Sequence, residues 1–286
     1  MKKTRKRVRK KQVIAVALAV VVIAIVSFSL NGYFSPLIEI KEKVSEPVEV
    51  LGPEKPKEEL KGKDRILSGK EEYPDWLLEF WNTHPESTDW VSVYPDFQKR
   101  PQEEIDQDAL QNIDLEKHKQ VNGIPLLFQW DPKWGYASYG ESVIGIEGCG
   151  PTCLSMVLTG LLDDPSYTPK RIADFSLENG YYHEGSGTDW TLMEFGAQEL
   201  GLAATQIQTW SGDVVKGELQ AGHPMICSMG PGDFTDKGHF IVLSGVTEDG
   251  SIIVNDPNSP KNSETLWDVW TLLNQMKGMW TFSIPE

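Results

Sequence analysis

The amino-terminal thirty residues carry two contrasting patterns. Residues 1–12 contain eight Lys and Arg and no acidic residue, whereas residues 13–30 are apolar or small and carry no charge. An apolar run of this length suits one helical crossing of a membrane, and basic residues before it favour a cytoplasmic amino terminus. The pattern predicts a basic cytoplasmic tail at 1–12, a transmembrane signal anchor at 13–30, and an extracytoplasmic remainder attached to the cell membrane.

The end of this apolar run bears on whether the signal is removed. A cleaved signal peptide usually has an apolar stretch of about 7–15 residues followed by a small-x-small site. Here the run is longer and ends in Ser27-Phe28-Ser29-Leu30-Asn31-Gly32, which is a poor cleavage site. The sequence therefore favours an uncleaved anchor, with a cleaved and secreted form as the alternative.

The polar segment that follows separates the anchor from the first aromatic residues. Residues 31–73 are rich in Lys, Glu and Pro and lack periodic apolar positions, which predicts a flexible stalk. Trp76, Leu77, Phe80 and Trp81 then recur near helical spacing and predict a helical pair. Because two short helices cannot bury so many aromatic side chains, we expect residues 74–120 to form a helical appendage and connector that packs on the domain that follows.

Helical and strand patterns both occur in the last part of the chain, residues 121–286. We expect helices at 150–162, 169–180, 189–200 and 212–220, and strands at 224–229, 239–246, 252–255 and 279–284. Helices that precede a series of antiparallel strands are typical of an α+β domain. The pattern predicts one such domain over residues 121–286.

Charge and composition exclude several functions. The formal net charge is −15, although the first twelve residues alone supply eight cations. A domain this acidic is a poor ligand for nucleic acid. The chain has no Cys-x-x-Cys or His-x-x-x-His pattern and no Gly-x-x-x-x-Gly-Lys-[Ser/Thr] loop, so neither a metal nor another cofactor is expected.

The cysteines are few and odd in number for an exported protein. They are Cys149, Cys153 and Cys227, which imply no disulfide framework. Two arrangements remain open: Cys153 pairs with Cys227, or no disulfide forms. Either arrangement leaves Cys149 free.

Cys149 stands where an apolar helix is predicted to begin. It is flanked by Gly148 and Gly150, and Pro151 suits a first helical turn. Unpaired N–H groups and the helix dipole at such an end lower the pKa of a thiol. We expect the glycines to leave room for a substrate backbone. A free cysteine is more often a small buried residue, but two flanking glycines argue against that role here.

Two later residues can complete a nucleophilic site. His239 heads an apolar strand, and Asp256 follows the next strand. A turn near residues 248–250 would make these strands an antiparallel hairpin and bring both side chains to the same end of the sheet. Alone, each residue would usually be structural, but a thiol, a base and an acid in this order predict a catalytic triad.

Four blocks of sequence, in order, resemble the C39-like family of papain-fold cysteine peptidases. They are Gln129-Trp130-Asp131-Pro132-Lys133-Trp134, Gly148-Cys149-Gly150-Pro151-Thr152, Gly238-His239-Phe240-Ile241-Val242 and Asn255-Asp256-Pro257. The resemblance covers about residues 124–286. It implies a papain-like fold, in which a helical first half with the nucleophile at a helix amino terminus packs on an antiparallel sheet.

The resemblance also assigns roles to residues. Cys149 would be the nucleophile, His239 the base and Asp256 the residue that orients the base. Gln129 would supply its side-chain amide to the oxyanion hole, beside the backbone N–H of Cys149. Preorganised donors of this kind stabilise the negative charge of a tetrahedral intermediate.

The predicted function is that of an extracytoplasmic cysteine peptidase that hydrolyses a peptide or protein substrate through an acyl-enzyme. Two alternatives remain: an amidase or transpeptidase that acts on cell-wall peptides, and a non-catalytic surface binding domain. Family members attached to exporters trim leader peptides inside the cell. That role is not expected here, because the chain has no phosphate-binding loop and its domain is predicted to face outward.

Overall fold

The computed structural model describes residues 60–285, which all belong to one compact unit. The predicted cytoplasmic tail, the anchor at 13–30 and the stalk up to residue 59 lie outside the described residues. Within residues 60–285, no helix combines the length and the apolar character needed to cross a membrane.

Short helices make up the first part of the described chain. They are α2 (Gly62–Ser68), η2 (Lys70–Glu72), α3 (Asp75–Thr83), η3 (Pro85–Ser87), α4 (Thr88–Ser92), α5 (Tyr94–Phe97), α6 (Gln102–Ala109) and η4 (Leu115–Lys117). We call residues 62–117 the helical segment. Its first helix lies in the predicted stalk, which is therefore folded at its carboxyl end. The reason is that Ile66 and Tyr73 are buried in the core and supply the apolar contacts that a stalk lacks.

The remaining elements belong to the domain predicted over 121–286. The helices are α7 (Ile144–Glu147), α8 (Cys149–Leu162), α9 (Pro169–Glu178), η5 (Leu192–Gly196), α10 (Ala197–Glu199), α11 (Gly212–Gln220), α12 (Pro260–Glu264) and α13 (Val269–Leu273). The strands are β1 (Gln120–Val121), β2 (Ile124–Pro125), β3 (Ser138–Tyr139), β4 (Ser142–Val143), β5 (Tyr182–His183), β6 (Gly187–Thr188), β7 (Ala203–Gln206), β8 (Met225–Met229), β9 (His239–Val246), β10 (Ile252–Asn255), β11 (Leu266–Trp267) and β12 (Met276–Ser283).

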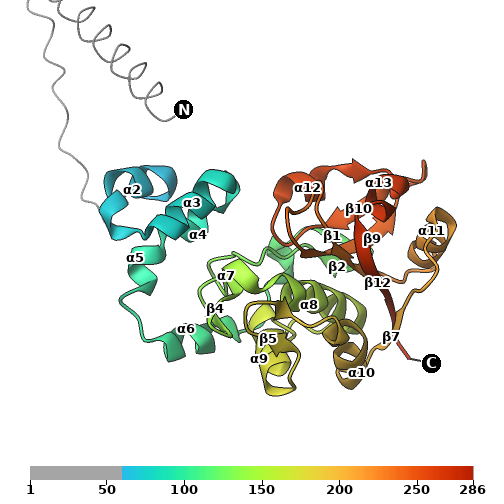
Figure 1. Cartoon of the computed structure of the whole chain (residues 1–286). Helices are drawn as coiled ribbons and strands as arrows, with labels where there is room; N and C mark the ends of the chain where they lie inside the picture. Colours follow the sequence, from blue (N-terminus) through green and yellow to red (C-terminus); the bar gives the residue numbers. More distant parts are fainter. Residues whose placement is uncertain (1–59, 286) are drawn as a thin grey trace, which may run out of the picture. The chain divides into compact units, whose positions relative to one another are not determined.

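A six-stranded antiparallel sheet organises the domain. Its strand order is β11-β10-β9-β8-β12-β7, and Figure 1 shows α8 beside it. Strands β9 and β10 have the predicted bounds. The turn that joins them lies where expected, since Gly250 N–H donates to Thr247 O and Thr247 N–H donates to Ser251 O. The predicted α+β class is confirmed.

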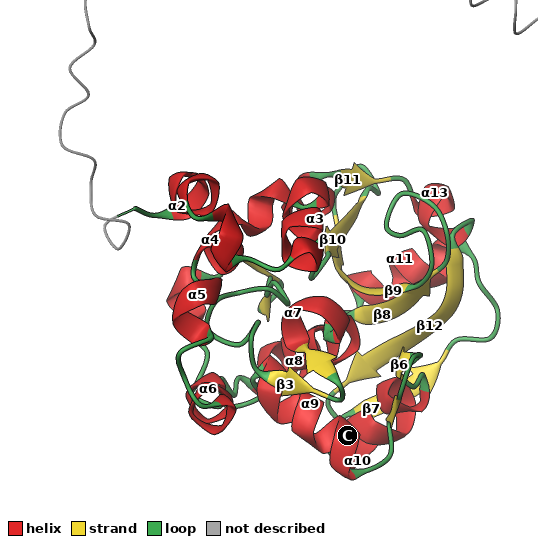
Figure 2. Ribbon diagram, turned by 60° about the vertical axis from the view of Figure 1, so that its left-hand side comes forward, coloured by secondary structure: helices red, strands yellow, loops and turns green. Residues whose placement is uncertain are grey.

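The sheet separates two apolar clusters. Because side chains alternate between the faces of a strand, Ile226 and Val242 join one cluster, while Cys227 and Ile241 join the other. The first cluster includes α8 and α9, and the second includes α11 and α13 (Figure 2). Burial on both faces explains why β8 and β9 are continuous apolar runs rather than alternating ones.

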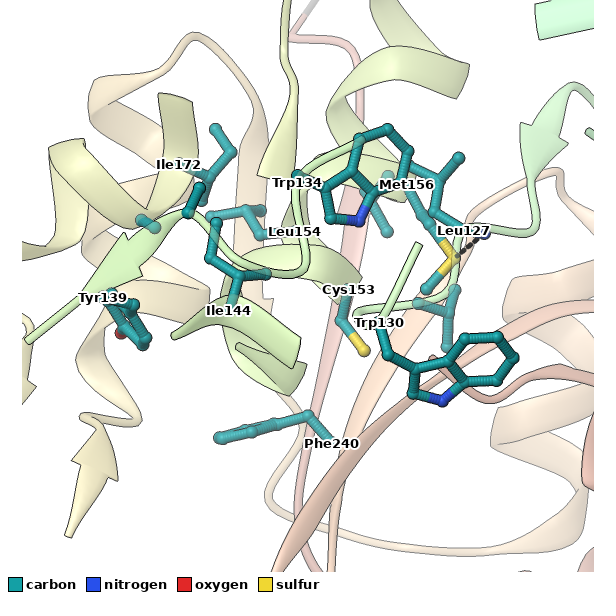
Figure 3. Close-up of a cluster of buried hydrophobic side chains, with 14 of the residues drawn as sticks. Leu127, Trp130, Trp134, Tyr139, Ile144, Cys153, Leu154, Met156, Ile172 and Phe240 are labelled. Atoms are coloured by element: carbon teal, nitrogen blue, oxygen red, sulfur yellow. Dashed lines mark hydrogen bonds between the residues drawn. The ribbon is translucent and has the colours of Figure 1, made fainter. Parts of the chain in front are cut away.

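Helix α8 is the central helix of the first cluster. Its residues from Gly150 to Thr159 are all buried, which suits a helix that is apolar on every side. Figure 3 shows Cys153, Leu154 and Met156 of this helix among the side chains of the cluster. The burial of α8 fixes its amino terminus, where Cys149 lies.

Some elements differ from the sequence prediction. The helix expected at 189–200 begins only at about Leu192 and opens with a π-helical turn, because the Asp189 carboxylate accepts the N–H of Thr191 and holds the chain in a turn before it. Strand β7 and helices α12 and α13 were not predicted. The two helices have only five residues each, and their starts are fixed by the caps Ser259 and Asp268 rather than by an apolar period.

The helical segment shares the first apolar cluster with the domain. Trp90 of α4 is fully buried, and its ring stacks on Tyr136 with 4.8 Å between centroids. A charged contact joins the same two parts: the ammonium of Lys170, which is only 4 % exposed, lies 3.7 Å from the carboxylate of Asp106 in α6 and also pairs with Asp174. The expected packing of the aromatic helices on the domain is confirmed by these contacts.

Candidate active site

Cys149 is the first residue of α8 and its side chain is partly exposed. Both glycines beside it are needed for packing. A Cβ on Gly148 would lie 2.5 Å from the carbonyl oxygen of Ile144, and a Cβ on Gly150 would lie 2.7 Å from Thr188 Oγ1. The expectation that these glycines make room for a substrate backbone is thus replaced by a structural reason: they let α7 and β6 approach the start of α8.

His239 and Asp256 meet at one end of the β9–β10 hairpin. Strand β9 begins at His239, and β10 ends one residue before Asp256. The Nε2 atom of His239 lies 2.7 Å from Oδ1 of Asp256, and both side chains are buried. Because Nε2 is engaged by the carboxylate, Nδ1 is the ring nitrogen left for the thiol of Cys149, with which His239 also forms a hydrogen bond.

The Asp256 carboxylate is held by two further donors. Its Oδ1 accepts the backbone N–H of Asn258 at 2.8 Å, and its Oδ2 accepts Nδ2 of Asn262 at 2.8 Å. Ser263 Oγ accepts the backbone N–H of Asp256 at 2.9 Å. Three donors on one buried carboxylate fix its position. Sequence reasoning did not find Asn262 or Ser263, although Ser259-Pro260 is a recognisable helix start.

The electrostatics favour an ion pair of thiolate and imidazolium. Burial would raise the pKa of the Cys149 thiol, but the hydrogen bond and charge of His239 and the N–H groups of Phe240 and Gly150 lower it below its ordinary value. Burial would lower the pKa of His239, but the charge and hydrogen bond of Asp256 and the contact with Cys149 raise it to about 10. Each partner therefore stabilises the charged form of the other.

Cys153 and Cys227 have the opposite character. Both are buried, and burial raises the pKa of each thiol. All three cysteines are free, so of the two arrangements that the sequence left open, the structure has the one without a disulfide. Cys153 packs in the first apolar cluster and Cys227 in the second.

Gln129 lies between helix α7, which leads to Cys149, and the turn at Asp256–Asn258, which we call the acid turn. Its backbone N–H donates to Pro257 O, and its side-chain Nε2 donates to the carbonyl oxygens of Gly145 and Ile146 in α7 at 3.0 and 3.2 Å. Its Oε1 is buried and has no hydrogen-bond partner in the described part of the chain. The side chain is thus placed near the other site residues, with its N–H groups turned toward α7.

A pocket of about 710 Å³ opens beside α7, on the side of the helical segment. Its lining is mixed: aromatic and aliphatic side chains, among them Tyr94, Tyr136 and Ile146, alternate with polar and charged ones, among them Arg100 and Glu141. Ile146 precedes Cys149 by three residues, so their Cα atoms are at most about 11 Å apart. A pocket of this size and mixed lining is large enough for a segment of a peptide.

Other candidates do not join the site. Trp130 and Trp134, from the first of the four sequence blocks, are buried in the core. His183 pairs with Asp189, and His223 pairs with Glu218 on α11. Across residues 60–285, the structure holds no group of three or more His, Cys, Asp or Glu side chains arranged to hold a metal ion.

Two solved structures resemble part of this chain. One is a protein from Bacillus anthracis described as a C39-like peptidase; it is 14% identical, and the match covers 59% of this chain and 99% of that one, with a TM-score of 0.38. Another is the peptidase domain of Streptococcus ComA, a bifunctional ABC transporter involved in a quorum-sensing pathway; it is 18% identical, and the match covers 47% and 93% of the two chains, with a TM-score of 0.34.

No curated protein matches the sequence. A family model does, over residues 121–281, which is more than half of the chain and spans all four residues of the candidate site. The fold is that of a papain-like cysteine peptidase, with the thiol at the amino terminus of a buried helix and the histidine and acid on an antiparallel hairpin. This chain belongs to the Peptidase_C39 like family.

Proposed function

We propose that this protein is a cysteine peptidase that hydrolyses peptide bonds through a covalent acyl-enzyme. The observation that carries the proposal is the contact of His239 with both partners: its Nε2 atom lies 2.7 Å from the buried carboxylate of Asp256, and it also forms a hydrogen bond with the Cys149 thiol. A nucleophile, a base and a group that orients the base are the parts that acyl transfer requires.

The chemistry proceeds in two halves. The Cys149 thiolate attacks the carbonyl carbon of the scissile amide, the carbonyl π electrons move to oxygen, and an oxyanion forms. His239 gives its Nδ1 proton to the amide nitrogen as the C–N bond breaks, which releases an amine and leaves a thioester. His239 then takes a proton from water, the resulting hydroxide attacks the thioester, and a carboxylic acid leaves as the Cys149 thiolate re-forms.

The oxyanion needs donors at the amino terminus of α8. The backbone N–H of Cys149 is one, and the Gln129 amide is the second. For this role one N–H of Gln129 must turn from the carbonyl oxygens of Gly145 and Ile146 to the oxyanion. The pocket beside α7 would then receive part of the bound peptide.

Reaction of the protein with a mixed peptide library tests the proposal. We expect mass spectrometry to find cleaved peptides with the wild-type chain and none with Cys149→Ala, whereas Cys153→Ala and Cys227→Ala should retain cleavage. Brief iodoacetamide treatment should label Cys149 much faster than the two buried thiols, whose pKa values are raised.

The same experiment separates the alternative functions. Cleavage or exchange of cell-wall peptides, with no cleavage in the library, would replace the peptidase by an amidase or transpeptidase. A reactive Cys149 with no product from either substrate would favour a binding domain. Equal cleavage by wild type and Cys149→Ala would reject Cys149 as the nucleophile.

We further propose that the peptidase domain acts outside the cytoplasm. The support is the basic run at 1–12 followed by the apolar run at 13–30. Protease added to intact cells, or to spheroplasts where a wall blocks access, is expected to remove the domain. Protection of the domain until the cells are lysed would contradict this orientation, and a cytoplasmic protein probed in parallel shows that the cells stayed intact.

A further inference from the structure

The helical segment reaches the acid turn of the active site although it precedes the region matched by the family model. His84, directly after α3, has its Nε2 atom 3.1 Å from Nδ2 of Asn258. The imidazole is fixed from its other side: Nδ1 lies 2.9 Å from Thr83 Oγ1 and 3.3 Å from the carbonyl oxygen of Phe80, and the ring stacks on the Phe80 ring with 4.3 Å between centroids. Because the Thr83 hydroxyl donates its own hydrogen to the Phe80 carbonyl oxygen, Nδ1 is the donor on this side of the ring, and Nε2 is left to accept from Asn258.

Asn258 connects His84 to the carboxylate of Asp256, because it forms a hydrogen bond with each of them. Its backbone N–H donates to Oδ1 of Asp256 at 2.8 Å, and that same oxygen binds Nε2 of His239 at 2.7 Å. The side chain of Asn258 therefore ties His84 to a turn whose backbone sets the aim of Asp256. The Oδ1 atom of Asn258 is buried and, among residues 60–285, has no hydrogen-bond partner, so His84 provides the contact that holds this amide.

A second contact of the helical segment involves Gly145, which holds the side chain of Gln129. Trp90 lies against Gly135 and Gly145, where a Cβ on either glycine would be 2.5 Å from the indole ring. The carbonyl oxygen of Gly145 accepts a hydrogen bond from Nε2 of Gln129. Trp90 therefore fixes the helical segment firmly to the domain a short distance along the chain from His84.

We infer that His84 is a positioning residue of the active site, which holds the Asp256–Asn258 turn so that Asp256 Oδ1 stays aimed at His239. Loss of this contact allows the turn to move and weakens the bond from His239 Nε2 to Asp256. A histidine that is held less firmly supports the Cys149 thiolate less well. The helical segment is thus part of the active centre of this chain. For its effect on turnover, the inference rests on the proposed peptidase function.

Two variants separate the hydrogen bond from packing. His84→Phe keeps a ring that can stack on Phe80 but removes the acceptor, whereas His84→Gln removes the ring but keeps an acceptor oxygen. We expect His84→Phe to lower kcat/KM about tenfold and to move the midpoint of the pH dependence of Cys149 alkylation to higher pH. His84→Gln should restore much of both. His223→Ala, which removes a histidine bonded to Glu218 on α11, is the control and should change neither.

Iodoacetamide alkylation is measured without any peptide substrate, so the two proposals fail in different ways. If the wild-type protein cleaves no peptide but His84→Phe still shifts the alkylation profile, the positioning role stands and the peptidase function fails. If His84→Phe has the wild-type profile, the positioning role is wrong, whatever the peptide assays show. A lower melting temperature with an unchanged profile means that His84 only stabilises the fold, and it also rejects the inference.

Discussion

Replacing His239 by Ala is expected to lower kcat/KM for peptide hydrolysis by about 10³-fold or more. The variant loses the proton donor for the leaving amine, the base for deacylation and the cation that stabilises the thiolate. Single-turnover measurements with a peptide found in the library screen would show the loss in the acylation step. A drop of only a few fold would mean that another group carries the proton.

The pH dependence of the wild-type protein follows from the two shifted groups. The Cys149 thiol, whose pKa is lowered, becomes a thiolate below the pH at which an ordinary thiol does. His239, whose pKa is raised to about 10, remains an imidazolium until the pH approaches 10. The rate of hydrolysis should rise as Cys149 loses its proton and fall as His239 loses its own near pH 10.

In His239→Ala only the burial of Cys149 and its two backbone N–H donors remain. Since burial raises the pKa of the thiol and the cation that opposed it is gone, the midpoint of the alkylation profile should move to higher pH. His223→Ala serves as the control for a folded protein that lacks a different histidine. An alkylation midpoint that stays in place in His239→Ala would show that the helix end alone activates the thiol.

Replacing Asp256 by Ala is expected to reduce kcat/KM by about 10²-fold or more and to lower the free energy of unfolding by about 3 kcal/mol. The carboxylate is 1 % exposed and accepts from His239, Asn258 and Asn262. Its removal leaves three donors without an acceptor inside the protein. Urea denaturation measures the stability change, and alkylation against pH measures the change at Cys149.

Asp256→Asn should keep more activity than Asp256→Ala. An amide oxygen in the place of Oδ1 can still accept from His239 and from the N–H of Asn258, and the ion pair does not need a carboxylate to choose the tautomer, because both ring nitrogens of an imidazolium carry protons. The amide nitrogen would face the Nδ2 atom of Asn262, so that the Asn262 side chain must turn to present its oxygen.

Asp249→Asn is the matched control for this series. Asp249 lies in the turn at the other end of the same hairpin, where its carboxylate bonds to Thr247, and its loss should leave turnover and alkylation unchanged. If folded Asp256→Ala matches the wild type in both measurements, Asp256 is only a turn residue.

The sequence predicts the middle of the fold better than its edges. Strands β9 and β10 are apolar runs bounded by a turn, and α8 begins at a Cys-Gly-Pro segment, so local pattern alone locates them. The placement of His239 and Asp256 at one end of the sheet follows from the antiparallel hairpin. The start of α8 and the β9–β10 hairpin can thus be predicted, because each is determined by residues that are close together in the sequence.

The rest depends on contacts between distant segments. His84 and Asn258 are far apart in the sequence, and neither carries a local signal that it will meet the other. In the sequence, Gly148 and Gly150 predict room for a substrate backbone. In the structure, Ile144 and Thr188 lie so close to them that a side chain at either position would clash. The polar composition of α2 predicts part of a stalk, whereas its burial comes from helices that follow it in the chain.

The contact between Lys170 and Asp106 sets the smallest fragment that can be expected to fold. Lys170 lies in α9, inside the region matched by the family model, but Asp106 lies in α6, outside it. A fragment cut at residue 121 would keep a buried ammonium with one of its two carboxylates missing, and it would open the slot between Gly135 and Gly145 that Trp90 fills. The unit of folding is therefore larger than the unit of family resemblance. Because α2 packs on α4, which carries Trp90, expression of the domain should begin before α2.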